Sequence, residues 1–496
     1  MLLWLVLVPI IACALIGLCK MPARITALVS ASITLVLGVA AVIFAAGSEH
    51  PEALSQFLGH DLQMHLDLPM SNIMLLLTVV VTFAAIMGLR APDAKAERSW
   101  CISSLLISAG ATGAFVSDNL IAFYSFHELA LIPTFVMIGC YGRGERRTIA
   151  WRATIYLGLA SMVLLAGLLL LGVNMGSSTF SEIASLVYMG KMPADACAIS
   201  GLLLLGFGAL VSLFPFHSWA APAYASAPTP IAMLHAGVLK KFGLYGLFMI
   251  AYIFQRHVWE LFGCWNNLLL LCLLGNVLWV GYVTVSKTRL DDMLGNSSVM
   301  HMGYLFLAFA AFVASNGSNT LALKGAGVLM MAHGLSIAML FLLTGQIERR
   351  TNTLEISSLG GLARKMPLLG FLFGLAGMAS IGLPLLANFA GEFTIFVSCF
   401  QGWEPGESSF CCGILHTISG WFGGLGPVQI TLLFALWGLV ISAVYMLRAF
   451  RRVFEGSISP VCERATAALS PADITAALLL AALLVLFGIA PDLLYA

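Results

Sequence analysis

Charged residues are scarce in this chain of 496 residues. Asp, Glu, Lys and Arg together make up 9% of it, whereas a soluble domain carries about 25%. Hydrophobic residues account for 60%, and the mean hydropathy is +0.97. This composition excludes a water-soluble globular protein. The 24 basic and 23 acidic residues give a net charge of +1, so no excess of either sign is present to bind nucleic acid or an acidic partner.

The cysteines lack the spacing of a cofactor site. The eleven residues are dispersed except for the adjacent Cys411 and Cys412, and no C-x-x-C sequence occurs. We therefore exclude a disulfide scaffold, a zinc site and an iron–sulfur cluster, and expect no metal and no cofactor in this chain. Residues 1–19 carry neither a basic n-region nor an A-x-A cleavage site, so we predict that they form a retained membrane helix.

Apolar stretches follow one another along the chain with short polar breaks between them. Because a membrane-spanning helix needs about 20 apolar residues, we predict an all-α polytopic membrane protein of about 14 transmembrane helices. The predicted extents are 2–19, 25–46, 70–89, 100–116, 119–140, 151–173, 198–221, 227–252, 264–286, 294–314, 322–346, 366–400, 428–450 and 470–492. We predict two broken helices, one at Pro215 and one at Gly382 and Pro384.

The loops test this assignment, because Lys and Arg gather on the cytoplasmic side of a membrane. Nineteen of the 24 basic residues fall on one set of alternate connections, and two, Lys191 and Arg256, fall on the other. This bias predicts a multi-pass protein of the cell inner (cytoplasmic) membrane with both termini on the non-cytoplasmic side.

The two broken spans are the seventh and the twelfth, five spans apart. A five-helix unit crosses the membrane an odd number of times, so a second copy directly after it is inverted, as in many secondary transporters. We therefore predict two inverted five-helix repeats, each with a broken helix. Residues 1–99 would hold the first three helices, 100–254 the first repeat, 255–455 the second repeat and 456–496 the last helix.

His, Lys and Glu residues inside the predicted spans are few, and these side chains can all exchange protons. Each costs about 2.5–3.5 kcal/mol at the bilayer centre on insertion scales, so each needs an explanation. A series of His, Lys and Glu across a membrane is what a proton relay requires. The residues are His127, Glu128, His217, His235, Lys240, Lys241, His301, Lys324, His333 and Glu392.

Each of these residues also has a structural interpretation. Glu128 would join two helices as a buried carboxylate, and His217 would bind backbone groups freed at Pro215. Lys240 and Lys241 point about 100° apart on a helix, so they cannot both face one path, and we favour Lys241. Structural hydrogen bonding remains open for His301 and His333, and snorkelling for Lys324.

Seven segments together resemble one known family. They are DNLIAFYSFHELALIPTFVMIGCYG at 118–142, FPFHSW at 214–219, APTPIAMLHAGVLKKFGLYG at 227–246, SSVMHMGYLF at 297–306, MAHGLSIAMLFLLTG at 331–345, GGLARKMP at 360–367 and ASIGLPLLANFAGEF at 379–393. Their order and spacing over about 70–455 resemble the antiporter-like, proton-translocating membrane subunits of respiratory complex I, in the subunit M / chain 4 group of NADH-quinone oxidoreductases.

The resemblance implies a site and a set of partners. Glu128, Lys241, His333 and Glu392 match the family's proton-moving residues, and His127, His217, His235, Lys240 and His301 would support the relay. Protons would move along a horizontal polar axis, driven by quinone reduction elsewhere. NADH or another donor, FMN, iron–sulfur clusters and quinone would therefore belong to partner subunits, with further antiporter-like subunits beside this chain in the bilayer.

Three positions depart from the family pattern. His127 stands where the family has tryptophan, Leu210 stands where a lysine usually pairs with the glutamate at 128, and Asp291 replaces a second lysine. We hypothesise that His127, His217, His235 or Lys240 supplies the missing positive charge.

Two alternative functions remain open. The first is a cation/proton antiporter or membrane-bound hydrogenase subunit, since related subunits occur in such complexes. The second is a structural subunit that does not pump, which the absence of a lysine at Leu210 favours.

Overall fold

The computed structural model describes residues 1–45, 52–57, 60–64, 66, 70–401, 424–465 and 469–495. The first half contains α1 (Leu2–Gly17), α2 (Ala23–Ala45), β1 (Glu52–Phe57), β2 (His60–Met64), α3 (Ser71–Met87), α4 (Ala94–Val116), α5 (Leu120–Tyr141), α6 (Arg146–Met175), α7 (Phe180–Tyr188), α8 (Ala196–Val211), α9 (Ala220–Ser226), α10 (Thr229–Leu234), the π-helix η1 (His235–Leu239) and α11 (Lys241–Ile253). The two strands pair antiparallel, with Glu52 opposite Met64.

The second half is entirely helical where it is described. It contains α12 (Val258–Leu274), the π-helix η2 (Gly275–Val280), α13 (Gly281–Ser286), α14 (Leu290–Ala314), α15 (Thr320–Thr351), α16 (Leu362–Lys365), α17 (Pro367–Ile381), α18 (Ala387–Ser398), α20 (Pro427–Ala435), α21 (Trp437–Phe454), α22 (Pro460–Glu463), α23 (Pro471–Ile489) and the 3₁₀-helix η3 (Pro491–Leu494). The chain is therefore an all-α protein, as the sequence predicts, with one short hairpin that was not predicted.

The helices agree with a polytopic membrane protein. Within the described residues, ten helical segments are long and apolar enough to cross a membrane, and four shorter apolar helices fall at other predicted spans. The shorter helices are α1, α3, α8 and α17. The total of fourteen stays a prediction, because these four are below the length of a full span.

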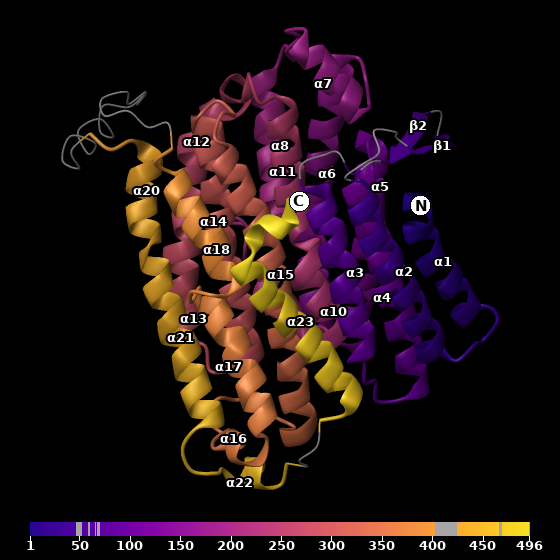
Figure 1. The fold of residues 1–496 in the computed structure, drawn as a ribbon, viewed down its shortest axis with the longest axis vertical. Coiled ribbons are helices and arrows are strands. Elements are labelled where there is room, and N and C mark those ends of the chain that lie inside the picture. Colours follow the sequence, from indigo (N-terminus) through magenta and orange to yellow (C-terminus); the bar gives the residue numbers. More distant parts are fainter. Residues whose placement is uncertain are drawn as a thin grey trace.

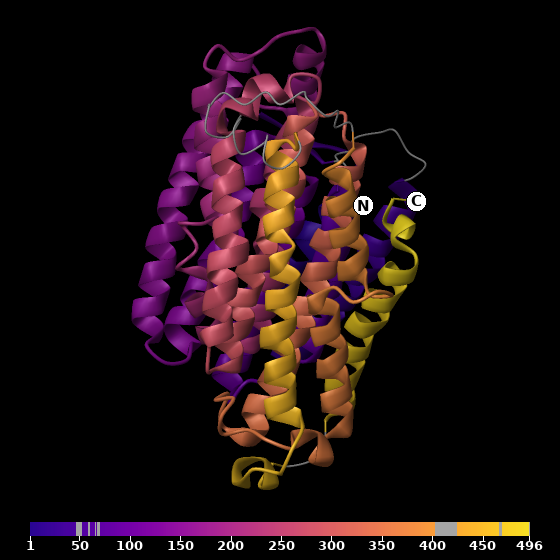
Figure 2. The ribbon, with the colours of Figure 1, turned by 90° about the vertical axis from the view of Figure 1, so that its left-hand side faces the viewer.

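The long helices run side by side along the longest axis of the molecule (Figure 1). Both termini lie toward the end of the bundle that carries α7, whereas α16 and α22 lie at the opposite end (Figures 1 and 2). An even number of crossings brings the termini to one side. The opposite end carries Arg364 and Lys365 in the last turn of α16, in agreement with the separation of charges predicted from the loops.

The structure confirms both predicted helix breaks. The first lies between α8 and α9, which are separated by 212–219 and thus by Pro215. The second lies between α17 and α18, where Gly382 ends α17 with φ +85°. Glycine adopts this left-handed conformation without a steric penalty. Each break leaves backbone groups without helical partners in the middle of the bundle.

Helix α15 is the centre of the bundle. Its most apolar window is completely buried, and it packs against α3, α10, α14, α17, α18 and α23. The π-helix η1 approaches α15 closely where Gly237 faces Gly334: a Cβ on Gly334 would lie 2.8 Å from the Gly237 carbonyl oxygen. Because neither glycine has a side chain at this crossing, the start of α11 lies directly beside α15.

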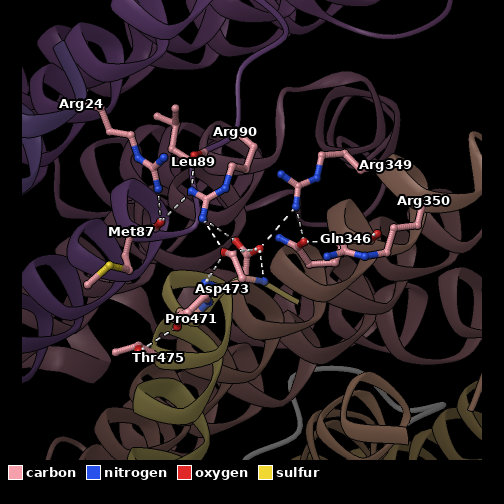
Figure 3. A network of polar contacts seen from close by, with 11 residues as sticks. Arg24, Met87, Leu89, Arg90, Gln346, Arg349, Arg350, Pro471, Asp473 and Thr475 are labelled. Carbon is pink, nitrogen blue, oxygen red and sulfur yellow. Dashed lines mark hydrogen bonds and ion pairs between the residues drawn. The ribbon is translucent and has the colours of Figure 1, made fainter. Parts of the chain in front are cut away.

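An ion-pair network joins α23 to this centre (Figure 3). Asp473, whose side chain is almost completely buried, lies 3.4 Å from both Arg90 and Arg349. It also completes a capping box with Ser470 at the start of α23. Because Arg90 follows α3 and Arg349 lies in α15, the contacts connect three helices. They lie toward the end of the bundle that carries Arg364 and Lys365, hereafter the basic end.

Candidate functional site: a buried row of protonatable side chains

A π-helical turn positions Lys241. The Lys240 amide donates to the His235 carbonyl five residues earlier, at 3.0 Å, and this widened turn sets the start of α11. The Lys241 ammonium donates to the Ala236 carbonyl oxygen at 2.6 Å. Turns of this kind inside α-helices are frequent at functional sites. The turn here directs a lysine with no exposed surface toward α15.

Four buried side chains from four helices form a row beginning at Lys241. Lys241 Nζ lies 2.9 Å from His333 Nδ1 on α15. The His333 and His301 rings, the latter on α14, are 5.9 Å apart between centroids. His301 Nδ1 lies 3.3 Å from Glu392 Oε1 on α18. Their exposed fractions are 0–2%, so the row, hereafter the Lys241–Glu392 row, is shielded from lipid.

Hydroxyl groups surround the histidines of this row. Tyr445 Oη of α21 lies 3.4 Å from His301 Nε2 and 2.6 Å from Ser297 Oγ. All three side chains are buried. Hydroxyls both donate and accept hydrogen bonds, so they can stabilise either protonation state of His301.

The helix break fixes Glu392. A Cβ placed on Gly382 would lie 2.3 Å from Glu392 Oε2, so the carboxylate occupies the space that a side chain would fill. Asn388 lies one turn earlier on α18, is fully buried and donates from Nδ2 to Ser336 Oγ at 3.4 Å. The broken helix thus brings a carboxylate and an amide to the end of the row.

Glu128 lies in a separate group with His127. Its side chain is 33% exposed, and its Oε1 lies 3.6 Å from Nδ1 of buried His127. The Ser161 hydroxyl of α6 donates to the same carboxylate and lies 3.2 Å from Tyr124 Oη. The His127 ring stacks on Phe242 with centroids 3.8 Å apart. Phe242, next to Lys241 in the chain, is therefore the link between this group and the row.

Lys240 and His235 lie in a third group. Lys240 Nζ donates to Ser298 Oγ of α14 at 3.4 Å and lies 5.3 Å from the Tyr224 ring centroid. His235 packs on Trp219 and Tyr224, with ring centroids 5.6 and 5.1 Å apart. The two adjacent lysines therefore have different partners, as the helical geometry predicts.

His217 stands apart from the three groups. It is half-buried in the first helix break, and its ring stacks on Phe214 with centroids 5.3 Å apart. Its Nδ1 has no hydrogen-bond partner among the described residues, and the same holds for Nδ1 of His127 and of His235. Buried polar atoms of this kind are the positions that ordered water occupies in proteins.

The four residues of the row were predicted from the sequence, but the hydroxyl groups around the site were not. The structure brings Lys241, His333, His301 and Glu392 together; it places Glu128 at the edge, in contact with His127. Tyr445, Ser297 and Ser161 were missed, although a hydroxyl within an apolar span is a signal that can be read from sequence. Among the described residues no group of three or more His, Cys, Asp or Glu has the geometry to hold a metal ion.

A buried row of proton-exchanging groups linked across four membrane-type helices defines a class of protein, the polytopic ion-translocating subunits. A family model described as NADH:quinone oxidoreductase/Mrp antiporter, TM, matches residues 117–411. The chain belongs to this family, and the resemblance read from its sequence motifs is confirmed.

Two relatives agree with this assignment. NAD(P)H-quinone oxidoreductase chain 4 1 of Synechococcus sp. (strain JA-3-3Ab) is 31% identical over 78% of this chain and 69% of its own length. NADH-quinone oxidoreductase subunit M of Rickettsia prowazekii is 27% identical over 84% of this chain and 78% of its own length. In fold, the chain is similar to one of respiratory complex I from Thermus thermophilus with bound NADH, with a TM-score of 0.82, 24% identity, and coverage of 100% of this chain and 96% of the other.

Proposed function

We propose that this chain is a proton-translocating membrane subunit of a complex I-like NADH:quinone oxidoreductase, and that protons move through the Lys241–Glu392 row. The observation that carries the proposal is the contact series itself, with Lys241, His333, His301 and Glu392 facing one another in sequence. Each member both gains and loses a proton in the accessible range when its surroundings change.

The relay begins at Glu128 and ends at Glu392. A change of charge near Glu128 and His127 alters the proton affinity of Lys241, whose proton passes to His333. A proton then leaves His301 for Glu392, which releases it outward. Ordered water would complete the step between His333 and His301, whose ring centroids are 5.9 Å apart.

The driving energy comes from partner subunits. Moving one charge against 100 mV costs about 2.3 kcal/mol, and we assign this chain no redox centre. NADH or another donor, FMN, iron–sulfur clusters and quinone would reside in those subunits. Membership of a family of oxidoreductase and antiporter complexes supports membrane partners. Glu128, one-third exposed in the isolated chain, would be covered by such a neighbour, because an exposed carboxylate in lipid is costly.

The orientation in the membrane is part of the proposal. We place the basic end of the bundle, which contains α16 and α22, on the cytoplasmic side of the inner membrane, and both termini on the other side. The alternation of Lys and Arg along the loops supports this placement.

Replacing Lys241 with methionine tests the relay directly. We expect Lys241→Met to abolish proton uptake coupled to quinone reduction in proteoliposomes containing the whole complex, measured with a pH-sensitive dye and normalised to assembled complex. Lys324→Met is the matched control, because Lys324 is exposed and lies over the Tyr495 ring, and we expect it to pump normally. Undiminished pumping by Lys241→Met at normal assembly would favour a structural subunit.

The family description also names Mrp antiporters, which favours cation/proton exchange as the second candidate. Sodium-dependent exchange by the purified assembly, without flavin or iron–sulfur subunits, would support that function. Co-purification with quinone-reducing subunits would support the first.

A further inference from the structure

Two cysteines on neighbouring helices face each other at the non-basic end of the bundle. Cys197 is the second residue of α8 and Cys264 lies in the second turn of α12, 67 positions later. Their sulfur atoms are 2.7 Å apart, and both residues are exposed.

The backbone around this pair is fixed independently of the sulfurs. The Trp265 indole donates from Nε1 to the Cys197 carbonyl at 2.8 Å. Its ring lies against Gly201, where a Cβ would be 2.8 Å from the nearest ring atom. The lack of a side chain at Gly201 therefore allows α12 to pack directly on α8, and this contact aligns the two thiols.

We propose that Cys197 and Cys264 form a disulfide that joins the two halves of the molecule at its outer face. The inference goes beyond proton transfer, but rests on the orientation proposed above, which places both residues on the non-cytoplasmic side. That compartment permits disulfides, whereas the cytoplasm keeps thiols reduced. The 2.7 Å separation leaves only a small approach to the bond length of about 2.05 Å.

The reaction is a thiol–disulfide exchange with an oxidoreductase of that compartment. One thiolate attacks the disulfide of the oxidoreductase, forming a mixed disulfide and releasing one of its thiolates. The thiolate of the second cysteine then attacks the sulfur of the first cysteine in the mixed disulfide, and the remaining thiolate of the oxidoreductase is released. The two cysteines give up two protons and two electrons in all, and the oxidoreductase leaves as a dithiol.

The disulfide would clamp elements that already meet at the first helix break. Asn276 of η2 accepts from the Phe214 amide at 2.6 Å and donates to the Ser212 carbonyl at 3.0 Å. Asn276 therefore ties the segment after α12 to the break after α8 deep in the bundle. The cysteine pair would hold the same two elements together near the surface, so that α8 and α12 move as one unit.

Thiol trapping in intact cells tests the proposal. Cells making the whole complex are treated with N-ethylmaleimide before lysis, and the chain is digested without reductant for mass spectrometry. We expect a linked pair of peptides containing Cys197 and Cys264, two hydrogens lighter than the two thiols, in the wild-type chain. Cys19 follows α1 and Cys140 lies in the last turn of α5, toward the opposite side of the bundle. Both are exposed, so they serve as internal controls and should carry the maleimide.

Three variants complete the experiment. Cys197→Ser should leave Cys264 alkylated, and Cys264→Ser should do the same for Cys197. The linkage should persist in Cys411→Ser/Cys412→Ser, which removes the two cysteines outside the described residues. Alkylation of both Cys197 and Cys264 in the wild-type chain without added reductant would overturn the proposal, as would their linkage to Cys411 or Cys412 instead of to each other.

Discussion

The two halves of the molecule surround their central carboxylates differently. Glu392 of the second half is 2% exposed and faces His301 at 3.3 Å. Glu128 of the first half is 33% exposed, lies 3.6 Å from His127, and receives a hydrogen bond from Ser161. One carboxylate is the buried end of the Lys241–Glu392 row, whereas the other lies at the edge of the isolated chain.

This difference indicates where a change of charge in a partner subunit can act on this chain. A carboxylate at the edge can sense a charge on a neighbouring subunit, because charges separated by a few ångströms interact strongly in a medium of low dielectric constant. A carboxylate enclosed by α14, α15, α17 and α18 has no such access to a neighbouring subunit and faces His301 of its own row. We therefore expect a signal from a partner subunit to act first on Glu128, whereas Glu392 takes part in the proton transfer itself.

The largest expected effect comes from replacing the two carboxylates one at a time. We expect Glu392→Gln to reduce proton pumping by the assembled complex to background, because the amide keeps the shape of the side chain but cannot exchange a proton. Glu128→Gln should retain part of the pumping, since Lys241, His333 and His301 remain in contact. Pumping is measured in proteoliposomes relative to quinone reduction. Equal losses in the two variants would contradict the division of roles.

The Gly382→Ala substitution should give the next largest effect. The new Cβ would lie 2.3 Å from Glu392 Oε2 at a position with φ +85°, so it displaces the carboxylate and adds about 1–3 kcal/mol of backbone strain. Gly456→Ala is a matched control, because Gly456 has φ +82° and nothing near the added Cβ. We expect a large loss of pumping at normal assembly in Gly382→Ala only, and similar thermal stability in both variants. A loss shared by Gly456→Ala would attribute the effect to strain.

Much of the fold follows from hydrophobic periodicity and helix breakers. Pro215 and Gly382 identified both broken helices, and the apolar runs identified the long spans. The π-helical turn at His235–Leu239 was not predicted, because no feature of its sequence HAGVL distinguishes a turn with one extra residue from a regular α-helical turn.

The residues of the site were predicted from the sequence, but the contacts between them were not. Scarcity of charge made Lys241, His333 and Glu392 conspicuous, since any ionisable group in lipid is costly. Whether Glu128 contacts the row depends on how α5 rotates against α11, and the sequence does not encode this in any local pattern. The stacking of His127 on Phe242 appears only in three dimensions. The pairing of Cys197 with Cys264 has the same origin, because 67 residues separate them.

Substitution of His127 tests which group supplies the positive charge beside Glu128. Among the four candidates for the positive charge missing at Leu210, only His127 contacts Glu128 in the described structure. His127→Phe preserves the stack on Phe242 but removes the nitrogen, so we expect a several-fold slower pumping rate. Adding Leu210→Lys should restore part of that rate, because the family resemblance places a lysine there beside the glutamate.

The control for this rescue is His127→Phe with Leu210→Met, which keeps an apolar side chain at the buried position 210. Rates are compared at equal quinone reductase activity. A rescue by methionine as large as that by lysine would show that packing, and not charge, limits the variant.

The smallest effect is expected from Ser161→Ala. The substitution removes one hydrogen bond to Glu128. A hydrogen bond to a charged group contributes about 1.5–3 kcal/mol, and the partial exposure of Glu128 reduces this to about 1 kcal/mol. We therefore expect less than about a tenfold change in pumping rate at normal assembly. Ser181→Ala is the matched control, because Ser181 donates to Asp118 instead. A loss in Ser161→Ala as large as that in Glu128→Gln would mean that the serine hydroxyl, and not the carboxylate alone, takes part in the first proton transfer.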